Sequence, residues 1–237
     1  MIVFNNVSFS YQKGEKILDN LNLELKPGLV LMVGPNGCGK STLLRLAAGV
    51  EIADSGQILI NGLDLWEEEV RSRNQLVYFP EYPDLTPYAT IKEVLDLVCL
   101  LRGKPIERGV EALRKTGLQH LMRRTVRELS QGQRRRILFA SCMVGDPSVI
   151  LLDEPLEGMD HQMQKEIVSW VREHMDDGVT ILLACHNFQP FIPMATQAVT
   201  IRNGQAVHVE TLSSNPHQKR LIVEALAGGS GIGLYHK

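Results

Sequence analysis

The chain is short of aromatic residues, of net charge and of long apolar runs, and each shortage excludes a class of protein. Aromatic residues make up 5% of its 237 residues and supply few stacking platforms for nucleic acid. A formal net charge of -2 gives no overall positive field to attract nucleic acid or an anionic membrane. No stretch reaches the about 18 uninterrupted apolar residues that a membrane-spanning helix needs. We therefore expect a chain that binds no nucleic acid and cannot cross a bilayer alone.

Cysteine is also scarce, and its spacing excludes two further classes. The four cysteines form no C-x-x-C pair and have no histidine at zinc-ligand spacing: Cys38, Cys99, Cys142 and Cys185. Such scattered cysteines suit a reducing compartment better than a disulfide framework. The segment "MIVFNNVSFS" has no basic region followed by a long apolar run, so we expect no signal peptide and a cytosolic location.

What the sequence does contain is an alternation of short apolar runs with longer amphipathic ones. Hydrophobic residues make up 44% of the chain, enough for one compact domain with a sizeable core. The alternation predicts an α/β fold with a largely parallel sheet. Strands are predicted at 1–9, 21–25, 28–34, 57–61, 75–79, 148–153, 179–185 and 198–201. Helices are predicted at 40–49, 91–102, 106–117, 130–144, 161–175 and 215–228.

The order of these elements predicts the organisation of a single domain, 1–237. Tight polar turns join the first strands, which predicts an antiparallel β subdomain at the N-terminus. No strand candidate lies between 85 and 129, so we expect a helical insert there. The α/β core, with its antiparallel subdomain, would then comprise 1–84 and 130–212. Residues 213–237 would form a helix and a frayed tail, because 228–237 is rich in glycine.

The most specific motif is "GPNGCGKST" at 34–42. Its Gly34, Gly39, Lys40 and Ser41 fit the P-loop pattern G-x-x-x-x-G-K-[ST], which predicts a P-loop NTPase core. An apolar strand leads into the loop and a helix leaves it, so backbone N–H groups and the helix N-terminus converge on phosphate. Lys40 would hold the β- and γ-phosphates of ATP and Ser41 would ligate Mg²⁺. The alternative is a glycine-rich turn with an incidental lysine.

Two further apolar strands end in polar residues. Asp153 and Glu154 close the strand "SVILLD", and the alternation of a strand would point them in different directions, one to a metal and one to water. His186 follows the strand "TILLAC" and could hydrogen-bond a γ-phosphate from the same edge of the sheet. Taken singly, the acids could be a solvated strand end and the histidine could be structural.

With the P-loop, "LSQGQ" at 129–133, "ILLDEP" and the strand-end histidine in this order, the sequence resembles the nucleotide-binding subunits of ATP-binding-cassette (ABC) transporters. The resemblance covers essentially the whole chain. It implies a second copy of the chain, or a homologous ATPase subunit, as partner. In this family the signature segment "LSQGQ" caps the ATP that is held by the partner's P-loop.

The resemblance also implies roles for individual residues. Nine residues would hold the phosphates: Gly34, Pro35, Asn36, Gly37, Cys38, Gly39, Lys40, Ser41 and Thr42. The family pattern places Ser130, Gly132 and Gln133 of the signature segment against the partner's nucleotide. Tyr11 would stack on adenine, and an ordinary strand-end aromatic is the alternative.

For catalysis, the resemblance implies that Asp153 fixes Mg²⁺ through its water shell and that Glu154 is the general base. His186 would sense and position the γ-phosphate, and Asp160 in "LEGMD" would bridge the two protomers.

The chain departs from the family pattern at Glu81, which stands where a glutamine is usual. Both side chains can ligate Mg²⁺, but the carboxylate adds a negative charge beside the phosphates, so Glu81 should strengthen metal binding. An exposed loop acid is the alternative. The "Pro-Glu" pair is associated with exporter-like members and gives a weak lean towards export. The variant residues in "LSQGQ" and "LEGMD" alter no implied contact.

Three arginines follow the signature segment, Arg134, Arg135 and Arg136. Successive side chains on a helix splay around its axis, so a solvated helix face is the favoured interpretation. In the family, a basic residue here often faces the partner's nucleotide.

The function predicted is therefore an ATPase that dimerises around two Mg-ATP molecules and powers a separate membrane-spanning permease subunit. The chain would be cytoplasmic and peripheral on the inner face of the cell membrane. A soluble ABC ATPase that drives assembly, for example of iron-sulfur clusters, is the alternative. A nucleotide-binding protein without turnover is a third, which intact Glu154 and His186 disfavour.

Overall fold

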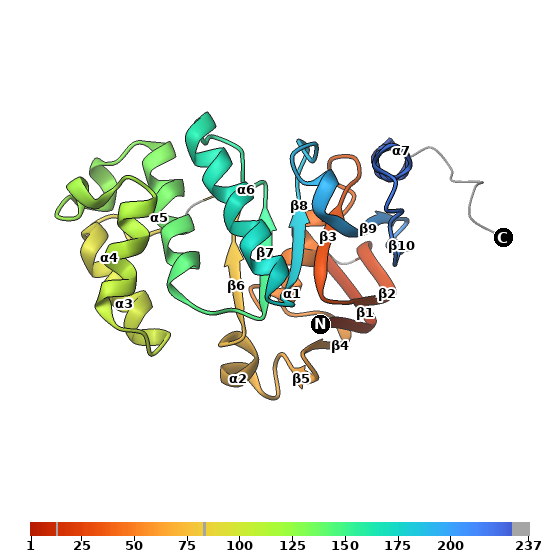
Figure 1. Cartoon of the computed structure of the whole chain (residues 1–237). Helices are drawn as coiled ribbons and strands as arrows, with labels where there is room; N and C mark the ends of the chain where they lie inside the picture. Colours follow the sequence, from red (N-terminus) through yellow and green to blue (C-terminus); the bar gives the residue numbers. More distant parts are fainter. Residues whose placement is uncertain (13, 83, 229–237) are drawn as a thin grey trace.

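A six-stranded sheet forms the centre of the molecule (Figure 1). The computed structural model describes residues 1–12, 14–82 and 84–228. The strands lie in the order β10 (Gln205–Val209), β9 (Ala195–Arg202), β3 (Gly28–Met32), β8 (Thr180–Ala184), β7 (Val149–Asp153) and β6 (Leu76–Phe79). All neighbours are parallel except β10, which is antiparallel to β9. The prediction of a largely parallel sheet is confirmed.

A smaller sheet is antiparallel throughout, as predicted for the N-terminal part of the chain. Its order is β2 (Glu15–Leu25), β1 (Ile2–Gln12), β4 (Ser55–Ile60) and β5 (Leu63–Asp64). Helix α1 (Lys40–Ala47) packs between this sheet and the central one, because its leucines share a core cluster with strands of both. The phosphate-binding motif therefore begins a helix that is buried on two sides.

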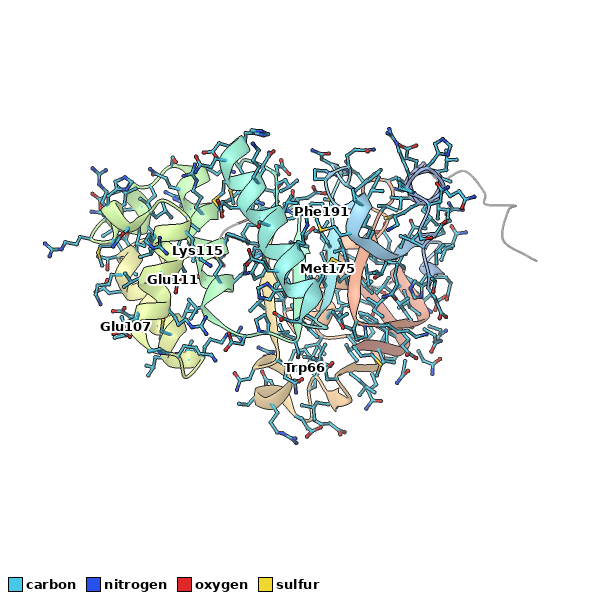
Figure 2. All side chains as sticks on the ribbon, viewed as in Figure 1. Trp66, Glu107, Glu111, Lys115, Met175 and Phe191 are labelled. Carbon is cyan, nitrogen blue, oxygen red and sulfur yellow. The ribbon has the colours of Figure 1, made fainter. Side chains whose placement is uncertain are left out.

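The other face of the central sheet is covered by helices. Its core cluster includes residues of α6 (His161–Asp176) and α7 (Pro216–Ala227). Phe191 is fully buried in this cluster and precedes the short turn Ile192–Met194. Met175 of α6 packs against the same cluster (Figure 2). Strands β7 and β8 are buried at every residue, which explains why their sequences are continuous apolar runs rather than alternating ones.

A helical subdomain lies at one end of the molecule, beside β6 (Figure 1). It contains α3 (Ile91–Leu101), α4 (Ile106–Lys115) and two short turns, Gln119–Leu121 and Val126–Glu128. Glu107, Glu111 and Lys115 follow one another along α4 at helical spacing (Figure 2). Helix α5 (Gln131–Val144) packs Ile137 and Ala140 into this subdomain and Phe139 into the core of the central sheet.

The two ends of the segment 87–127 are hydrogen-bonded to each other. The backbone N–H of Ile91 donates to the carbonyl of Arg124 at 3.0 Å, and that of Val126 donates to Ala89 at 2.9 Å. Capping boxes fix both ends: Thr90 with Glu93 and Thr125 with Glu128. The chain of the helical subdomain thus leaves and re-enters the rest of the molecule at neighbouring points.

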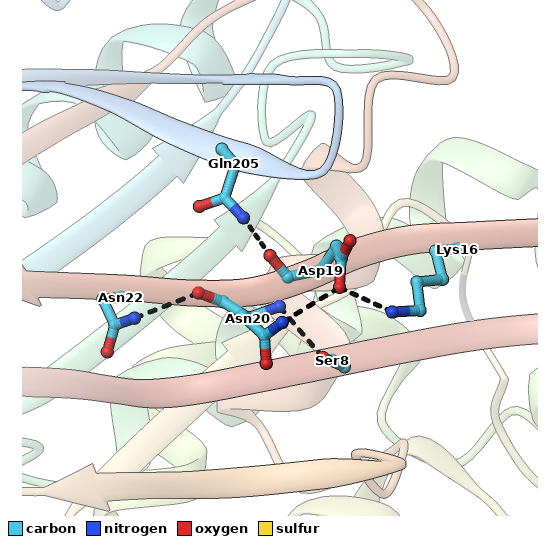
Figure 3. A network of polar contacts seen from close by, with 6 residues as sticks. All are labelled: Ser8, Lys16, Asp19, Asn20, Asn22 and Gln205. Carbon is cyan, nitrogen blue, oxygen red and sulfur yellow. Dashed lines mark hydrogen bonds and ion pairs between the residues drawn. The ribbon is translucent and has the colours of Figure 1, made fainter.

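A polar network joins the β1–β2 hairpin to the turn between β9 and β10 (Figure 3). Ser8 accepts from the backbone N–H of Asn20 at 2.9 Å, and the Asp19 carboxylate accepts from Lys16 at 2.6 Å. Gln205 donates to the backbone carbonyl of Asp19, and the N–H of Asp19 donates to the carbonyl of Gly204 at 3.0 Å. These contacts connect the two sheets near the P-loop.

The structure differs from the sequence prediction in a few elements. Strand β2 begins at Glu15 instead of residue 21, because its polar first half pairs with β1. Strand β10 and helix α2 (Glu69–Arg73) were not predicted, since both are short and partly exposed. The predicted frayed tail lies outside the described residues beyond Gly228. In the described part of the chain, no helix combines the length and apolar character needed to span a membrane.

Candidate functional site

The P-loop lies between β3 and α1, and its glycines are needed for its shape. Gly34 has φ of +143° and Gly39 has φ of +109°, values that residues with a Cβ rarely adopt. A Cβ on Gly34 would lie 2.8 Å from Thr200 Oγ1 and 3.0 Å from Cys38 Sγ. The loop can therefore pass this close to β9 only with glycine at position 34.

Lys40 is held inside the loop. Its side chain is buried, and its ammonium group donates to the carbonyl oxygens of Gly34 at 2.9 Å and Pro35 at 3.1 Å. Because phosphate oxygens are stronger acceptors than neutral carbonyls, a phosphate that entered the loop would compete for this charge.

A hollow of about 550 Å³ lies over this loop. Most of the predicted site residues line it: Tyr11, Asn36, Gly37, Gly39, Lys40, Ser41, Thr42, Glu81, Glu154 and His186. Gly34, Pro35 and Cys38 belong to the loop but do not line this hollow. Ile17 and Glu157 line it and were not predicted, because neither lies in a residue pattern that signals nucleotide binding.

Asp153 is the last residue of β7 and is almost completely buried. Burial raises the pKa of its carboxyl group to about 6, opposed by a hydrogen bond from Ser41 and assisted by the negative charge of Glu81. A buried carboxylate with a raised pKa is stabilised by a cation placed beside it. Asp153 and Ser41 therefore form a pair that suits a metal ion.

The sequence predicted that Glu154 follows the alternation of the strand, and this prediction is wrong. The Glu154 φ of +47° is left-handed, so the turn after β7, not the pleat, directs its side chain. Glu154 Oε2 accepts from the backbone N–H of His186 at 3.1 Å, and Oε1 lies 3.6 Å from His186 Nε2. Burial raises the pKa of Glu154, and this hydrogen bond and the His186 side chain oppose the shift. The acid and the histidine thus meet at the same edge of the sheet.

Tyr11 lies at the rim of the pocket with 51% of its surface exposed. Its hydroxyl is 3.3 Å from Thr42 Oγ1, and its ring packs edge-on against Phe9 with the centroids 4.8 Å apart. The stacking of adenine on this half-exposed ring stays a prediction.

Glu81 also faces the pocket and follows β6 by two residues. Its carboxylate interacts with the hydroxyl of Tyr82, whose pKa it raises, and with Asp153, whose pKa it also raises. Glu81 is therefore close to the predicted metal site instead of being an isolated loop acid.

The signature segment lies apart from this pocket. Ser130 is the N-cap of α5: its hydroxyl accepts from the backbone N–H of Gln133 at 3.3 Å, and Gln133 accepts from the N–H of Ser130 at 3.0 Å. Gly132 packs closely, since a Cβ there would lie 3.3 Å from the carbonyl of Gly158. None of these residues lines the hollow over the P-loop. Their contact with a nucleotide remains a prediction about a dimer.

Asp160 has partners within its own chain. Its carboxylate accepts from the N–H of Met163 at 2.9 Å as the N-cap of α6, and its other oxygen pairs with Arg136. A role in bridging two protomers likewise stays a prediction.

The expectation that the three arginines form a solvated face is wrong for Arg135, which is 3% exposed. Its side chain points into the interior, where its guanidinium carbon lies 5.0 Å from the centre of the Phe79 ring. Arg134 donates to the carbonyls of Val126 at 3.2 Å and Arg127 at 3.1 Å. The helix carries these side chains to three different environments, because residues one apart splay around its axis.

The donor set fits Mg²⁺. In the described residues, no group of three or more His, Cys, Asp or Glu side chains could hold a metal ion alone. Mg²⁺ commonly uses one or two carboxylates together with water and substrate phosphates. Ser41, Asp153 and Glu81 supply oxygen ligands of that kind beside the P-loop.

Comparison with known proteins agrees with this geometry. Residues 18–157 match the ABC transporter family. The chain is 36% identical over 216 residues to the sulfate/thiosulfate import ATP-binding protein CysA of Synechocystis sp., covering 89% of this chain and 60% of the relative. It is 32% identical to the spermidine/putrescine import ATP-binding protein PotA of Vibrio cholerae, covering 86% and 55%. It thus spans a little over half the length of these relatives.

A probable CysA of Chlorella vulgaris is 33% identical and is matched over 94% of its length and 91% of this chain. Among solved structures, an ATP-binding subunit of an ABC transporter superposes with a TM-score of 0.82 at 22% identity, covering 94% of both chains. A dimeric ATP-binding cassette in a post-hydrolysis state with ADP and Pi gives 0.79 at 22% identity, covering 88% of this chain and 98% of that one. These structures show the shared fold, and the family match and sequence relatives show that the chain belongs to the ABC transporter family.

Proposed function

We propose that the chain binds Mg-ATP, hydrolyses it to ADP and phosphate, and thereby powers transport by a separate membrane-spanning subunit. The observation that carries this proposal is the pocket in which Lys40, Glu154 and His186 face one another over the P-loop. Phosphoryl transfer requires mainly positioning and neutralisation of charge, and this pocket supplies groups for both.

The residues would divide the work by their chemistry. Lys40 places a positive charge on the phosphates, and Ser41 and Asp153 would hold the metal. Mg²⁺, when bound with ATP, neutralises phosphate charge. Glu154 would accept a proton from the attacking water as general base, and the backbone N–H of His186 fixes the orientation of that carboxylate.

The signature segment would act in a dimer. Ser130 and Gly132 lie outside the pocket of their own chain, so the geometry is compatible with their facing a partner's nucleotide. A hydrogen bond to a charged group is worth about 1.5–3 kcal/mol, so one at each of two sites would favour closure by about 3–6 kcal/mol. Hydrolysis would remove these contacts and allow the dimer to open.

A surface of the helical subdomain offers a place for the membrane partner. Large apolar side chains are exposed on α3 and on the segment before it: Tyr82, Tyr88, Leu97, Leu100 and Leu101. We propose that a cytoplasmic segment of the permease covers them, which would place the chain on the inner face of the membrane. The weak lean towards export has no support, because the relatives whose names state a direction of transport are import proteins.

The decisive experiment is Glu154→Gln in the purified chain. We expect ATP hydrolysis to fall by about 10² to 10⁴, the usual contribution of a general base, while ATP binding persists and a closed dimer accumulates. Glu210→Gln is the control, since Glu210 is exposed and pairs with Lys26 far from the pocket. A Glu154→Gln chain that turns over at the parental rate would remove Glu154 from the role of base.

The partner is tested separately by gentle detergent extraction of native membranes with the chain tagged. A polytopic membrane protein that co-purifies in fixed ratio would support transport. A soluble partner, with the chain absent from the membrane fraction, would instead favour an ATPase that drives assembly.

A further inference from the structure

Arg135 connects the two segments that carry acids of the pocket. One guanidinium nitrogen, Nη1, donates to the backbone carbonyl of Glu81, and Nη2 donates to the backbone carbonyl of Glu154 at 2.6 Å. The side chain is buried against Phe79 and does not line the pocket itself. A single residue of α5 therefore holds the loop after β6 and the turn after β7 in a fixed relation.

The turn at Glu154 depends on such contacts. A left-handed φ is unfavourable for a residue with a Cβ, so neighbouring groups must hold it in place. The N–H of Glu154 donates to the carbonyl of Ala184 at 2.8 Å, and its side chain accepts from His186. Both partners belong to β8 and the residues after it. Arg135 supplies the contact to the Glu154 carbonyl from a helix on the other side.

The surroundings also explain why a charge is tolerated there. Burial lowers the pKa of the Arg135 guanidinium, and the nearby carboxylates of Glu157, Glu81, Asp153 and Glu154 oppose that shift. A buried cation encircled by acids keeps its charge and stays fixed. The segment after Glu154 also touches it, since a Cβ on Gly158 would lie 3.5 Å from Arg135 Cδ.

We propose that Arg135 is a positioning residue for ATP hydrolysis, which holds the Glu81 and Glu154 backbones so that the Glu154 carboxylate is aimed at the attacking water. The inference rests on the proposed ATPase function. Arg135 acts through other residues, so it should govern turnover more than the affinity for ATP, which Lys40 and the P-loop provide.

Two substitutions separate its charge from its geometry. Arg135→Lys keeps the positive charge, but a single ammonium group cannot donate to both carbonyls as the planar guanidinium group does. Arg135→Met keeps an apolar side chain and removes every hydrogen-bond donor. Arg102→Lys is the matched control. Arg102 is also partly buried and donates to the carbonyl of Leu76 at 2.8 Å, at the opposite end of β6 from the pocket.

In steady-state assays we expect kcat to fall about 10- to 100-fold in Arg135→Lys and further in Arg135→Met, while KM for ATP changes by less than about threefold. Hydrogen exchange should become faster in peptides that cover 80–82 and 154–158, and stay unchanged in β3. Arg102→Lys should keep the parental kcat and the parental exchange at both segments.

Parental kcat and parental exchange in Arg135→Lys would overturn the inference, and so would an equal loss of kcat in Arg102→Lys. If Arg135→Met does not fold, the lysine variant decides the question. Wild-type protein that fails to hydrolyse ATP would refute the proposed function instead, and hydrogen exchange would still report whether Arg135 holds the two segments.

Discussion

The P-loop and the start of α5 both carry sequence motifs that predict contact with phosphate, yet their polar groups are arranged differently. Lys40 faces a hollow of about 550 Å³, and its contacts to two carbonyls are ones that a phosphate could replace. At the start of α5, Ser130 and Gln133 satisfy each other, and Arg135 and Arg136 bind acceptors of the same chain. The first region is shaped as a ligand site within one chain.

This difference separates what one chain can do from what needs a second. In the α5 region, capping and charge pairing already use the side chains, so these stabilise the fold before any nucleotide arrives. We therefore expect changes in the P-loop to alter ATP affinity in a single chain. Changes at the start of α5 should alter stability or turnover instead.

The largest effect should come from Lys40→Met. The substitution removes a charge that would make about two hydrogen bonds to phosphate, each worth about 1.5–3 kcal/mol, so ATP affinity should fall at least about 10²-fold. Fluorescence titration with a labelled ATP analogue measures this. Lys26→Met is the control, because Lys26 lies in an exposed pair with Glu210. Parental affinity in Lys40→Met would place phosphate binding elsewhere.

A second effect concerns Asp153 and pH. Because its pKa is raised to about 6 in the folded chain, the folded state keeps a proton that the unfolded state loses near pH 4. Stability contributed by this protonation is therefore lost as pH rises from about 4 to 6, on the order of 2–3 kcal/mol. Without nucleotide, Asp153→Asn should be more stable than the parent at pH 7.5, and the difference should fade towards pH 4.

Urea unfolding at several pH values tests this expectation. Asp146→Asn is a control for which the opposite change in stability is expected. A hydrogen bond from Lys104 lowers the pKa of Asp146, so its charged form stabilises the folded state above that pKa, and removing the charge should destabilise the chain there. Equal stability of Asp153→Asn and the parent at pH 7.5 would contradict the cost assigned to the buried carboxylate.

A somewhat smaller loss is expected for Gly34→Ala. The new Cβ would sit on a left-handed backbone and lie 2.8 Å from Thr200 and 3.0 Å from Cys38. We therefore expect urea unfolding to show a loss of about 2 kcal/mol in the free energy of unfolding. Gly62→Ala separates the two causes. Gly62 has φ of +82° but nothing within 4 Å of a Cβ, so only about 1 kcal/mol should be lost. Equal losses in both variants would mean that the close approach to β9 does not matter.

The smallest effect should come from Ser130→Ala. Losing the N-cap of α5 should cost about 1 kcal/mol in urea unfolding, while a single chain at high dilution keeps its affinity for ATP. Thr90→Ala, which removes the equivalent cap of α3, gives the matched comparison. Weaker ATP binding by dilute Ser130→Ala would show that the signature segment serves its own chain's pocket.

Much of the fold could be predicted because local patterns coincide with the final structure. Strands β7 and β8 are buried on both faces, so their apolar runs report burial directly. Most of the P-loop residues could be predicted for a similar reason, since glycine at 34 and 39 is required by backbone angles that other residues avoid.

Two features of the site could not be predicted, because each arises from contacts distant in the sequence. The burial of Arg135 depends on Glu81 and Glu154, which lie 54 and 19 residues away. Glu157 lines the pocket from the turn after β7, which begins with the left-handed residue Glu154, and no alternation rule anticipates such a turn. Packing and tertiary hydrogen bonds decide such positions, and a sequence pattern reports neither.

The closed attachment of the helical subdomain has a consequence for how such a chain can vary. Because Ile91 bonds to Arg124 and Val126 bonds to Ala89, the chain leaves the core and returns to it at one point. Parts of this segment that do not contact the core can lengthen, shorten or be replaced without moving β6 or the turn after β7, whereas Arg102 at the end of α3 donates to the carbonyl of Leu76 and ties that end to β6. The apparatus that would bind ATP could thus stay constant while the part exposed to a partner is exchanged.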